Sequence, residues 1–157
     1  MTKTETVYQK KKKIKQRQLA DLRIFLRGKG SGGKVREYIG LNVGELKILL
    51  ESRMKPSMSW NNYGKHWQVD HVVPFWLFDM DDEKDLKLVW HPDNLLPLIG
   101  KHNNHKEGNL EFALSVLRES PWSHRTEILM ERVEKELKIM DEYKKTYLSG
   151  KYYNSLK

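Results

Sequence analysis

The stretch that decides the fold is MSWNNYGKHWQVDHVVP, residues 58–74. Its first part is rich in Ser, Asn and Gly, which is typical of a loop, whereas residues 67–73 first alternate in polarity and then become apolar. We therefore predict a strand over this second range, ending at Pro74. Asp70 and His71 then lie next to each other near the end of that strand.

Two helices are predicted before this strand. Residues 5–27 indicate a basic helix that ends at the glycine-rich segment 28–34, for which we predict a flexible loop. A second helix is predicted over residues 43–54. Asn42 and Glu45 are spaced as a capping box at the start of this helix.

The rest of the chain combines loops with further helices. We predict an acidic surface loop at 79–85, a strand or short helix at 86–90, a short helix from near Lys101, and longer helices at 109–118 and 121–147. Ser120 and Pro121 are predicted to be the cap and the first residue of the last helix. A small amount of β-strand among several helices indicates an α+β fold.

The positive charge is concentrated at the start of the chain. Residues 1–38 hold 12 basic and 3 acidic side chains, a net charge of +9, whereas residues 39–157 hold 17 basic and 18 acidic side chains, a net charge of −1. Such a block favours a polyanionic partner, with nucleic acid first and an anionic membrane surface second. A solvated basic tail is the alternative.

The composition excludes several classes of protein. No cysteine is present, which excludes disulfides, zinc sites with cysteine ligands and thiol nucleophiles. A metal site would have to use His, Asp, Glu, Asn or backbone oxygen, and these ligands suit Mg²⁺ or Mn²⁺. The apolar runs are too short to span a membrane and no secretory signal is visible, so we expect no membrane partner and a cytoplasmic location.

The segment GKGSGGK, residues 28–34, matches part of a P-loop. Val35 follows where Ser or Thr would be needed to hold Mg²⁺, and a helix rather than a strand is predicted before it. We therefore interpret the segment as a loop in which Lys29 and Lys34 contact phosphates by charge.

The residues with catalytic potential are Asp70, His71, Asn94 and Asn103. Carboxylate and amide oxygens can hold a hard divalent ion, and a neutral His beside them can take a proton from water. A carboxylate, an imidazole and an amide brought together would make a plausible hydrolytic site.

Residues 58–74 resemble the first half of the HNH endonuclease motif, and are especially similar to the small HNH endonucleases of phages. The second half of the motif is similar to Asn94-Leu-Leu-Pro-Leu98 followed by Asn103, Lys106 and Gly108-Asn109. Residues 39–51 resemble the helix that lies upstream of the motif in those proteins. The resemblance covers residues 20–109.

This resemblance implies a ββα-metal, or His-Me finger, core of two strands and a helix around one metal ion. It implies that His71 is the general base, that Asp70 and Asn103 hold Mg²⁺ or Mn²⁺, and that Lys106 contacts phosphate. Asn94 matches the Asn that braces the loop between the strands through backbone hydrogen bonds and helps to orient His71.

The chain also departs from the family pattern. Many relatives have His at the position of Asn103, so the chain resembles an H-N-N variant, and His102 and Asn104 remain alternative ligands. Gln68 stands where relatives often have His, an extra residue precedes Asp70, and another is inserted before Gly108. Relatives often hold a structural zinc through paired cysteines, and none is expected here.

We expect a basic N-terminal arm at 1–38, an HNH nuclease core at 39–109 and a helical extension at 110–157, in which the last helix could form a homodimer. The expected function is metal-dependent hydrolysis of DNA, in a bacterial or phage-infected cell. The alternatives are an inactive HNH-fold protein of DNA binding or virion assembly, and a nuclease of RNA. The predicted DNA-binding side chains are Lys10, Lys11, Lys12, Lys13, Lys15, Arg17, Lys29, Lys34 and Lys106.

Overall fold

The structure is a computed structural model that describes residues 5–100, 109–120 and 123–148. At its centre is a two-stranded antiparallel sheet of β1 (Trp67–His71) and β2 (Leu95–Ile99). In the register, Trp67 is opposite Ile99 and His71 is opposite Leu95. The strand predicted before Pro74 is confirmed, although it ends three residues earlier, at His71.

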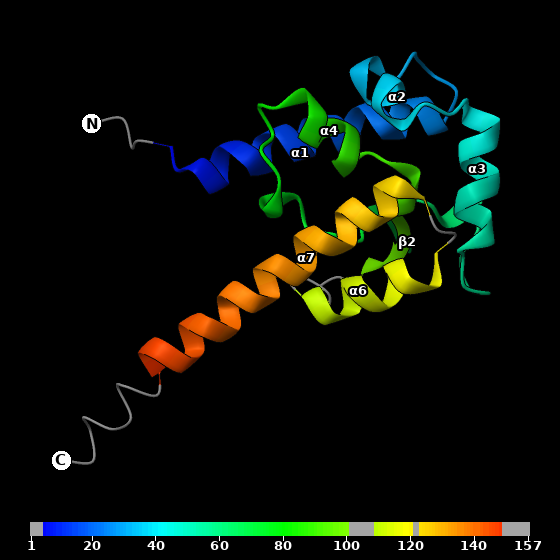
Figure 1. The fold of residues 1–157 in the computed structure, drawn as a ribbon. Helices are drawn as coiled ribbons and strands as arrows, with labels where there is room; N and C mark the ends of the chain where they lie inside the picture. Colours follow the sequence, from blue (N-terminus) through cyan, green and yellow to red (C-terminus); the bar gives the residue numbers. More distant parts are fainter. Residues whose placement is uncertain (1–4, 101–108, 121–122, 149–157) are drawn as a thin grey trace.

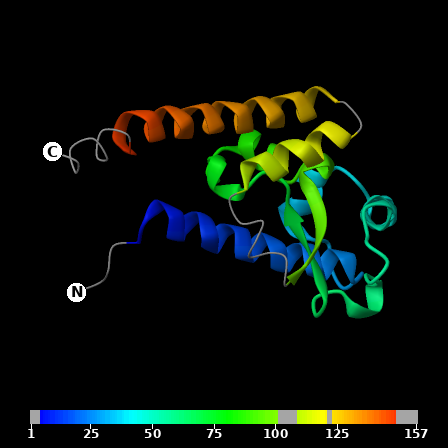
Figure 2. The ribbon, with the colours of Figure 1, turned by 90° about the horizontal axis from the view of Figure 1, so that it is seen from below.

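The helices enclose this hairpin from two sides. Figure 2 shows α1 (Val7–Leu26) along one side and α7 (His124–Tyr143) along the other, with the hairpin and α4 (Glu83–Val89) between them. The short helices α2 (Gly33–Ile39) and α3 (Val43–Ser52) cover one end, and α6 (Leu110–Glu119) packs against α7 (Figure 1). Helices with one small sheet make an α+β fold.

Single 3-10 turns join these elements. They are η1 (Trp60–Asn62), η2 (Phe75–Leu77) and η3 (Pro92–Asn94), and a π-helical turn, η4 (Lys144–Leu148), follows α7. The last of the 3-10 turns leads directly into β2.

The first long helix is a structural part of the core. Leu22, Phe25 and Leu26 are buried in the same hydrophobic cluster as the residues of the hairpin. The buried side chain of Gln18 accepts a 2.8 Å hydrogen bond from Nε1 of Trp90. The basic face of α1 is therefore fixed relative to the sheet and is not a loosely attached tail.

The loop predicted at 28–34 is shorter than expected. Gly32 has a left-handed backbone (φ 74°), and a Cβ atom built on it would lie 2.7 Å from Cβ of Phe25. This close approach allows α2 to begin at Gly33, so Lys34 lies in a helix and not in the flexible loop.

For the run at 86–90, the structure confirms the short helix over the strand: residues 86–89 belong to α4 and Trp90 is its C-cap. The acidic loop predicted at 79–85 is shorter than expected, because α4 begins at Glu83. Asp82 caps this helix by accepting a 3.1 Å hydrogen bond from the backbone N–H of Lys84. The second strand comes later, at Leu95–Ile99.

The two C-terminal helices were predicted with different success. The helix predicted at 109–118 is confirmed as α6, in which four apolar residues are buried: Leu110, Ala113, Leu114 and Leu117. The predicted cap of α7 was wrong, because Ser120 ends α6 and Ser123 caps α7, accepting a 3.2 Å hydrogen bond from the N–H of Thr126. Ile139, Met140 and Tyr143 near the end of α7 are exposed, and the homodimer through this helix stays a prediction.

Replacing Leu22 by Ala should destabilise the whole protein, because the side chain is fully buried at the contact of α1 with the core. We expect a loss of about 2–5 kcal/mol in the free energy of unfolding, measured with urea. Ile24→Ala on the exposed side of the same helix is the matched control, and should cost only about 0.5 kcal/mol. Equal effects would mean that α1 is not part of the cooperative core.

Candidate functional site

Asp70 and His71 form a fixed pair at the end of β1. They are the last two residues of the strand, and both are buried, with exposed fractions of 8% and 2%. Oδ1 of Asp70 accepts a 2.8 Å hydrogen bond from the backbone N–H of His71. Nδ1 of His71 lies 3.9 Å from the same carboxylate oxygen. The carboxylate and the imidazole therefore occupy one small region.

A buried tryptophan sets the place of the imidazole. The ring of Trp90 packs edge to face on the ring of His71, with 4.7 Å between centroids and 73° between planes. Trp90 directly follows α4 and is held by the hydrogen bond to Gln18 of α1. Two helices thus determine where the imidazole lies.

Asn94 ties together three segments that surround this pair. Its side-chain oxygen accepts a 2.7 Å hydrogen bond from the N–H of Val73, and its side-chain nitrogen donates a 3.0 Å bond to the carbonyl of Val89. Its backbone carbonyl accepts from the N–H of Val72 at 2.8 Å. The side chain is fully buried, and the backbone hydrogen bonds that the bracing role requires are present.

A polar network joins the same segment to α3 and α7. Oδ2 of Asp93 accepts a 2.6 Å hydrogen bond from Oγ1 of Thr126 in α7. Arg53, which follows α3, donates to the carbonyls of Pro92 and Leu95 at 2.7 and 2.6 Å. Asn94 therefore belongs to a segment that is anchored from both sides.

The basic helix reaches the pair through Lys15. Its Nζ lies 3.3 Å from Oδ1 of Asp70, and 4.8 Å from the centroid of the Phe75 ring. The lysine side chain is mostly buried in this position. A residue predicted to bind DNA thus forms an ion pair with the residue predicted to bind the metal.

The other predicted DNA-binding side chains fall into two groups. Lys10 forms a 2.6 Å ion pair with Asp81, Lys13 forms a 2.8 Å ion pair with Glu5, and Lys11 donates to the carbonyl of Trp76 at 3.3 Å. The hydrogen bond and the charge of Asp81 raise the pKa of Lys10. The remaining cations are exposed, and no ion pair joins them to acidic groups in the described ranges: Lys12, Arg17, Lys29 and Lys34.

A pocket of about 230 Å³ lies between α1 and β1, beside Asp70. Its lining is formed by Tyr8, Lys12, Lys15, Gln16, Leu19, Arg23, Gln68, Val69, Asp70 and Phe75. Nη2 of Arg23 donates to Oε1 of Gln68 at 3.2 Å, which places a cation beside β1. Arg23 was not among the predicted site residues, although its spacing from Lys12 and Lys15 on the helix could have indicated a shared face.

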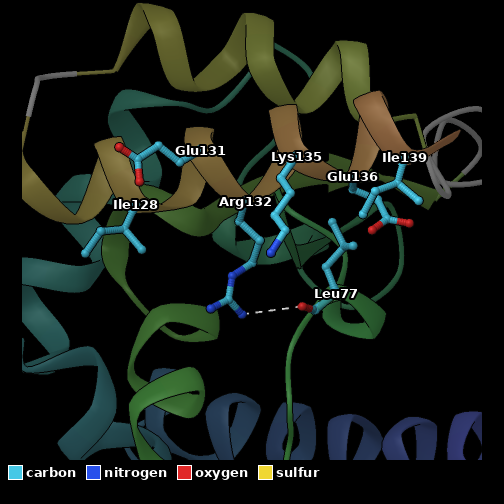
Figure 3. Close-up of a pocket in the computed structure, with 7 residues that line it drawn as sticks. All are labelled: Leu77, Ile128, Glu131, Arg132, Lys135, Glu136 and Ile139. Atoms are coloured by element: carbon cyan, nitrogen blue, oxygen red, sulfur yellow. Dashed lines mark hydrogen bonds between the residues drawn. The ribbon is translucent and has the colours of Figure 1, made fainter. Parts of the chain in front are cut away.

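A larger pocket of about 510 Å³ lies between α7 and Leu77 (Figure 3). Its arginine, Arg132, donates to both carboxylate oxygens of Asp85 at 2.8 and 2.9 Å, and to the carbonyl of Leu77 at 3.4 Å. Burial alone would raise the pKa of Asp85, but the hydrogen bonds and charge of Arg132 hold it below its usual range. These contacts attach α7 to the core.

The predicted metal ligands are only partly described. Asn103, its alternatives His102 and Asn104, and Lys106 lie outside the described residues. Within the ranges that the structure describes, no three His, Cys, Asp or Glu side chains gather in a group that could hold a metal ion. Of the predicted metal ligands, Asp70 lies within the described residues.

Comparisons with known proteins found two relatives in Acanthamoeba polyphaga mimivirus. Uncharacterized protein L426 is 31% identical over 77 residues, and uncharacterized protein L246 is 36% identical over 77 residues. These matches cover 49% and 48% of this chain, but only 34% of each relative. The chain thus matches about a third of the length of these relatives.

No family model matches the chain. No solved structure matches it. Among the described residues, none of the helices is both long enough and apolar enough to span a membrane.

Replacing Asn94 by Ala should destabilise the protein more than replacing an exposed Asn. The change leaves the N–H of Val73 and the carbonyl of Val89 without their side-chain partners, which should cost about 1–3 kcal/mol for each group. Urea unfolding measures this loss. Asn61→Ala at an exposed position is the control, and an equally stable Asn94→Ala protein would contradict the bracing role.

His91 should make stability depend on pH. Burial lowers its pKa below the ordinary 6.5, and this outweighs the opposing attraction of Asp93. His91 therefore binds a proton more readily in the unfolded chain than in the folded protein. As a result, the free energy of unfolding should fall as the pH drops below 6.5. Protonation would also remove the Nδ1 acceptor that receives the N–H of Asp93 at 3.2 Å.

The measurement is urea unfolding at pH 8 and pH 5.5. His91→Asn retains a side-chain acceptor for the cap and removes the titration, so the difference between the two pH values should shrink. His124→Asn, at an exposed position, should keep the wild-type difference. An unchanged difference in His91→Asn would assign the pH dependence to other groups.

Proposed function

We propose that the protein is a metal-dependent nuclease that hydrolyses phosphodiester bonds of DNA, with Asp70 and His71 at the centre of its active site. The observation that carries this proposal is the fixed carboxylate–imidazole pair at the end of β1, joined by the 2.8 Å hydrogen bond from the backbone of His71. Hydrolysis of a phosphodiester needs a base for water and a means of stabilising negative charge. This pair offers groups for both tasks.

We also propose that the hairpin forms the two strands of a ββα-metal core. The antiparallel pairing of β1 with β2 supports this, as does Asn94 directly before β2 with its bonds to Val72, Val73 and Val89. The third part of such a core would be a helix that carries Asn103. The finer fold therefore stays a proposal.

The donor chemistry fits Mg²⁺ or Mn²⁺. Asp70 is a carboxylate that borders an open pocket, and hard cations prefer carboxylate and amide oxygens. Asp70 and Asn103 would hold the cation, with His102 and Asn104 as alternatives to Asn103. When bound, the cation would supply stabilisation of negative charge on the phosphate and on the leaving oxygen.

The protein's own residues would do the rest. His71, in its neutral form, would take the proton from the water that attacks phosphorus. The bond from phosphorus to the 3′ oxygen would break and that oxygen would take a proton from solvent, giving a 5′-phosphate and a 3′-hydroxyl. Asn94 would act as a positioning residue, because it fixes the backbone just after His71. Since His71 has an exposed fraction of only 2%, this role requires the site to open when substrate binds.

The second candidate is an HNH-fold protein that binds DNA or takes part in virion assembly without cleaving. Two observations favour this candidate. The carboxylate of Asp70 is paired with Lys15, and the imidazole of His71 is buried away from solvent, although catalysis needs both groups to be accessible. An RNA substrate is a further alternative to DNA. Digestion of matched DNA and RNA strands separates the two substrates.

A plasmid-nicking assay tests the proposal. We expect nicking with Mg²⁺ or Mn²⁺ that stops with EDTA, and at least a 100-fold lower rate in His71→Ala with DNA binding retained. Because the ring of His71 packs on Trp90, circular dichroism should verify folding, and His71→Gln provides a second variant. His66→Ala is the control. Wild-type cutting by folded His71 variants would refute the role of His71, and binding without cutting would favour the second candidate.

A further inference from the structure

The pocket beside Asp70 has a lining that differs from an ordinary surface hollow. Its residues on α1 recur at helical spacing, at Tyr8, Lys12, Lys15, Leu19 and Arg23. Residues three or four apart share one face of a helix, so these side chains form a single row along the pocket. The row combines a ring and three cations, and Gln68 of β1 faces it.

We propose that this row is a binding site for single-stranded nucleic acid, in which cations of α1 contact phosphates and Tyr8 stacks on a base. The inference deepens the proposed nuclease function and rests on it, because it names the form of substrate delivered to Asp70. The site itself binds without any metal or bond cleavage. Its occupant is therefore measurable even if the protein does not cleave.

The charge of the pocket favours a phosphate chain. Lys12, Lys15 and Arg23 bring three positive charges, and Asp70 brings one negative charge that pairs with Lys15 at 3.3 Å. The helix that carries these cations is held in place, because α1 is packed into the core through Leu22 and Leu26. Cations on a fixed helix lose less conformational freedom on binding than cations on a mobile tail.

The size of the pocket favours one unit of a polymer over a separate small ligand. Pockets that enclose small molecules usually measure about 300–1,000 Å³, and this one has about 230 Å³. Tyr8 and Arg23 are 15 positions apart, which is about 22 Å along a helix, so the row extends well beyond a single nucleotide. The row can thus contact several successive phosphates while the pocket receives one nucleotide.

The exposed tyrosine favours a single strand over a duplex. Tyr8 has an exposed fraction of 50%, and its ring is supported by Phe75 at 5.9 Å between centroids. A supported ring offers a surface on which a base can stack, and bases are accessible for stacking when they are not paired. Tyr8 therefore distinguishes this site from a simple cationic surface.

The test is fluorescence anisotropy with a labelled eight-nucleotide thymidine oligomer, in EDTA, across a range of salt concentrations. Tyr8→Ala should weaken binding about 5-fold or more, whereas Tyr8→Phe should remain within about 2-fold because the aromatic face is kept. Lys12→Ala should lower the slope of log affinity against log salt by about 0.7. The controls on α7 are Tyr143→Ala and Lys138→Ala, which are exposed and do not line the pocket.

Three outcomes would overturn the site. They are equal effects of the Tyr8 and Tyr143 variants, preference for a duplex of the same length, and displacement of the oligomer by poly-glutamate as readily as by unlabelled oligomer. A separate nicking assay with Mg²⁺ distinguishes this failure from failure of the nuclease proposal. If binding depends on Tyr8 and Lys12 but no cleavage occurs, the binding site is retained and the nuclease proposal is rejected. If the protein cleaves DNA but the Tyr8 and Lys12 variants bind the oligomer as the wild type does, the nuclease proposal is retained and the binding site is rejected.

Discussion

The buried amide of Asn94 is the contact on which the rest of the structure depends. It accepts from the N–H of Val73 and donates to the carbonyl of Val89, so one side chain fixes the chain after β1 and the end of α4. A two-stranded hairpin has little stability by itself. Asp93 and Arg53 hold the segment of Asn94 through hydrogen bonds to Thr126 and to the carbonyl of Pro92. The small sheet can therefore hold Asp70 and His71 in one arrangement.

The N-terminal helix contributes both to the core and to the charge of the surface. Leu22 and Leu26 are buried in the core, while Lys12, Lys13 and Arg17 of the same helix are exposed. The cations of residues 1–38 therefore differ in whether they are available to a partner. Lys10 and Lys13 are paired with carboxylates, whereas Lys12 and Arg23 border the pocket beside Asp70.

The sequence predicted elements whose signals are local. The capping box of Asn42 and Glu45 is present at the start of α3, and α6 lies where a helix was predicted at 109–118. The residues of β2 did not predict a strand, because the run Leu95–Ile99 is apolar throughout and contains a proline. Its pairing with β1 is a tertiary contact that no local pattern indicates. The contact of Lys15 with Asp70 joins residues 55 positions apart, so no local pattern indicates it.

The central claim is that Asp70 and His71 form a metal-dependent hydrolytic centre. The most direct measurement is Mn²⁺ binding, by electron paramagnetic resonance, to the wild type and to Asp70→Asn, with plasmid nicking recorded in the same samples. The control is Asp81→Asn, whose carboxylate lies on the surface beside Lys10. We expect the wild type to bind one Mn²⁺ that Mg²⁺ displaces. Asp70→Asn should lose both this ion and nicking, and Asp81→Asn should retain both. Equal Mn²⁺ binding and nicking in all three proteins would contradict it.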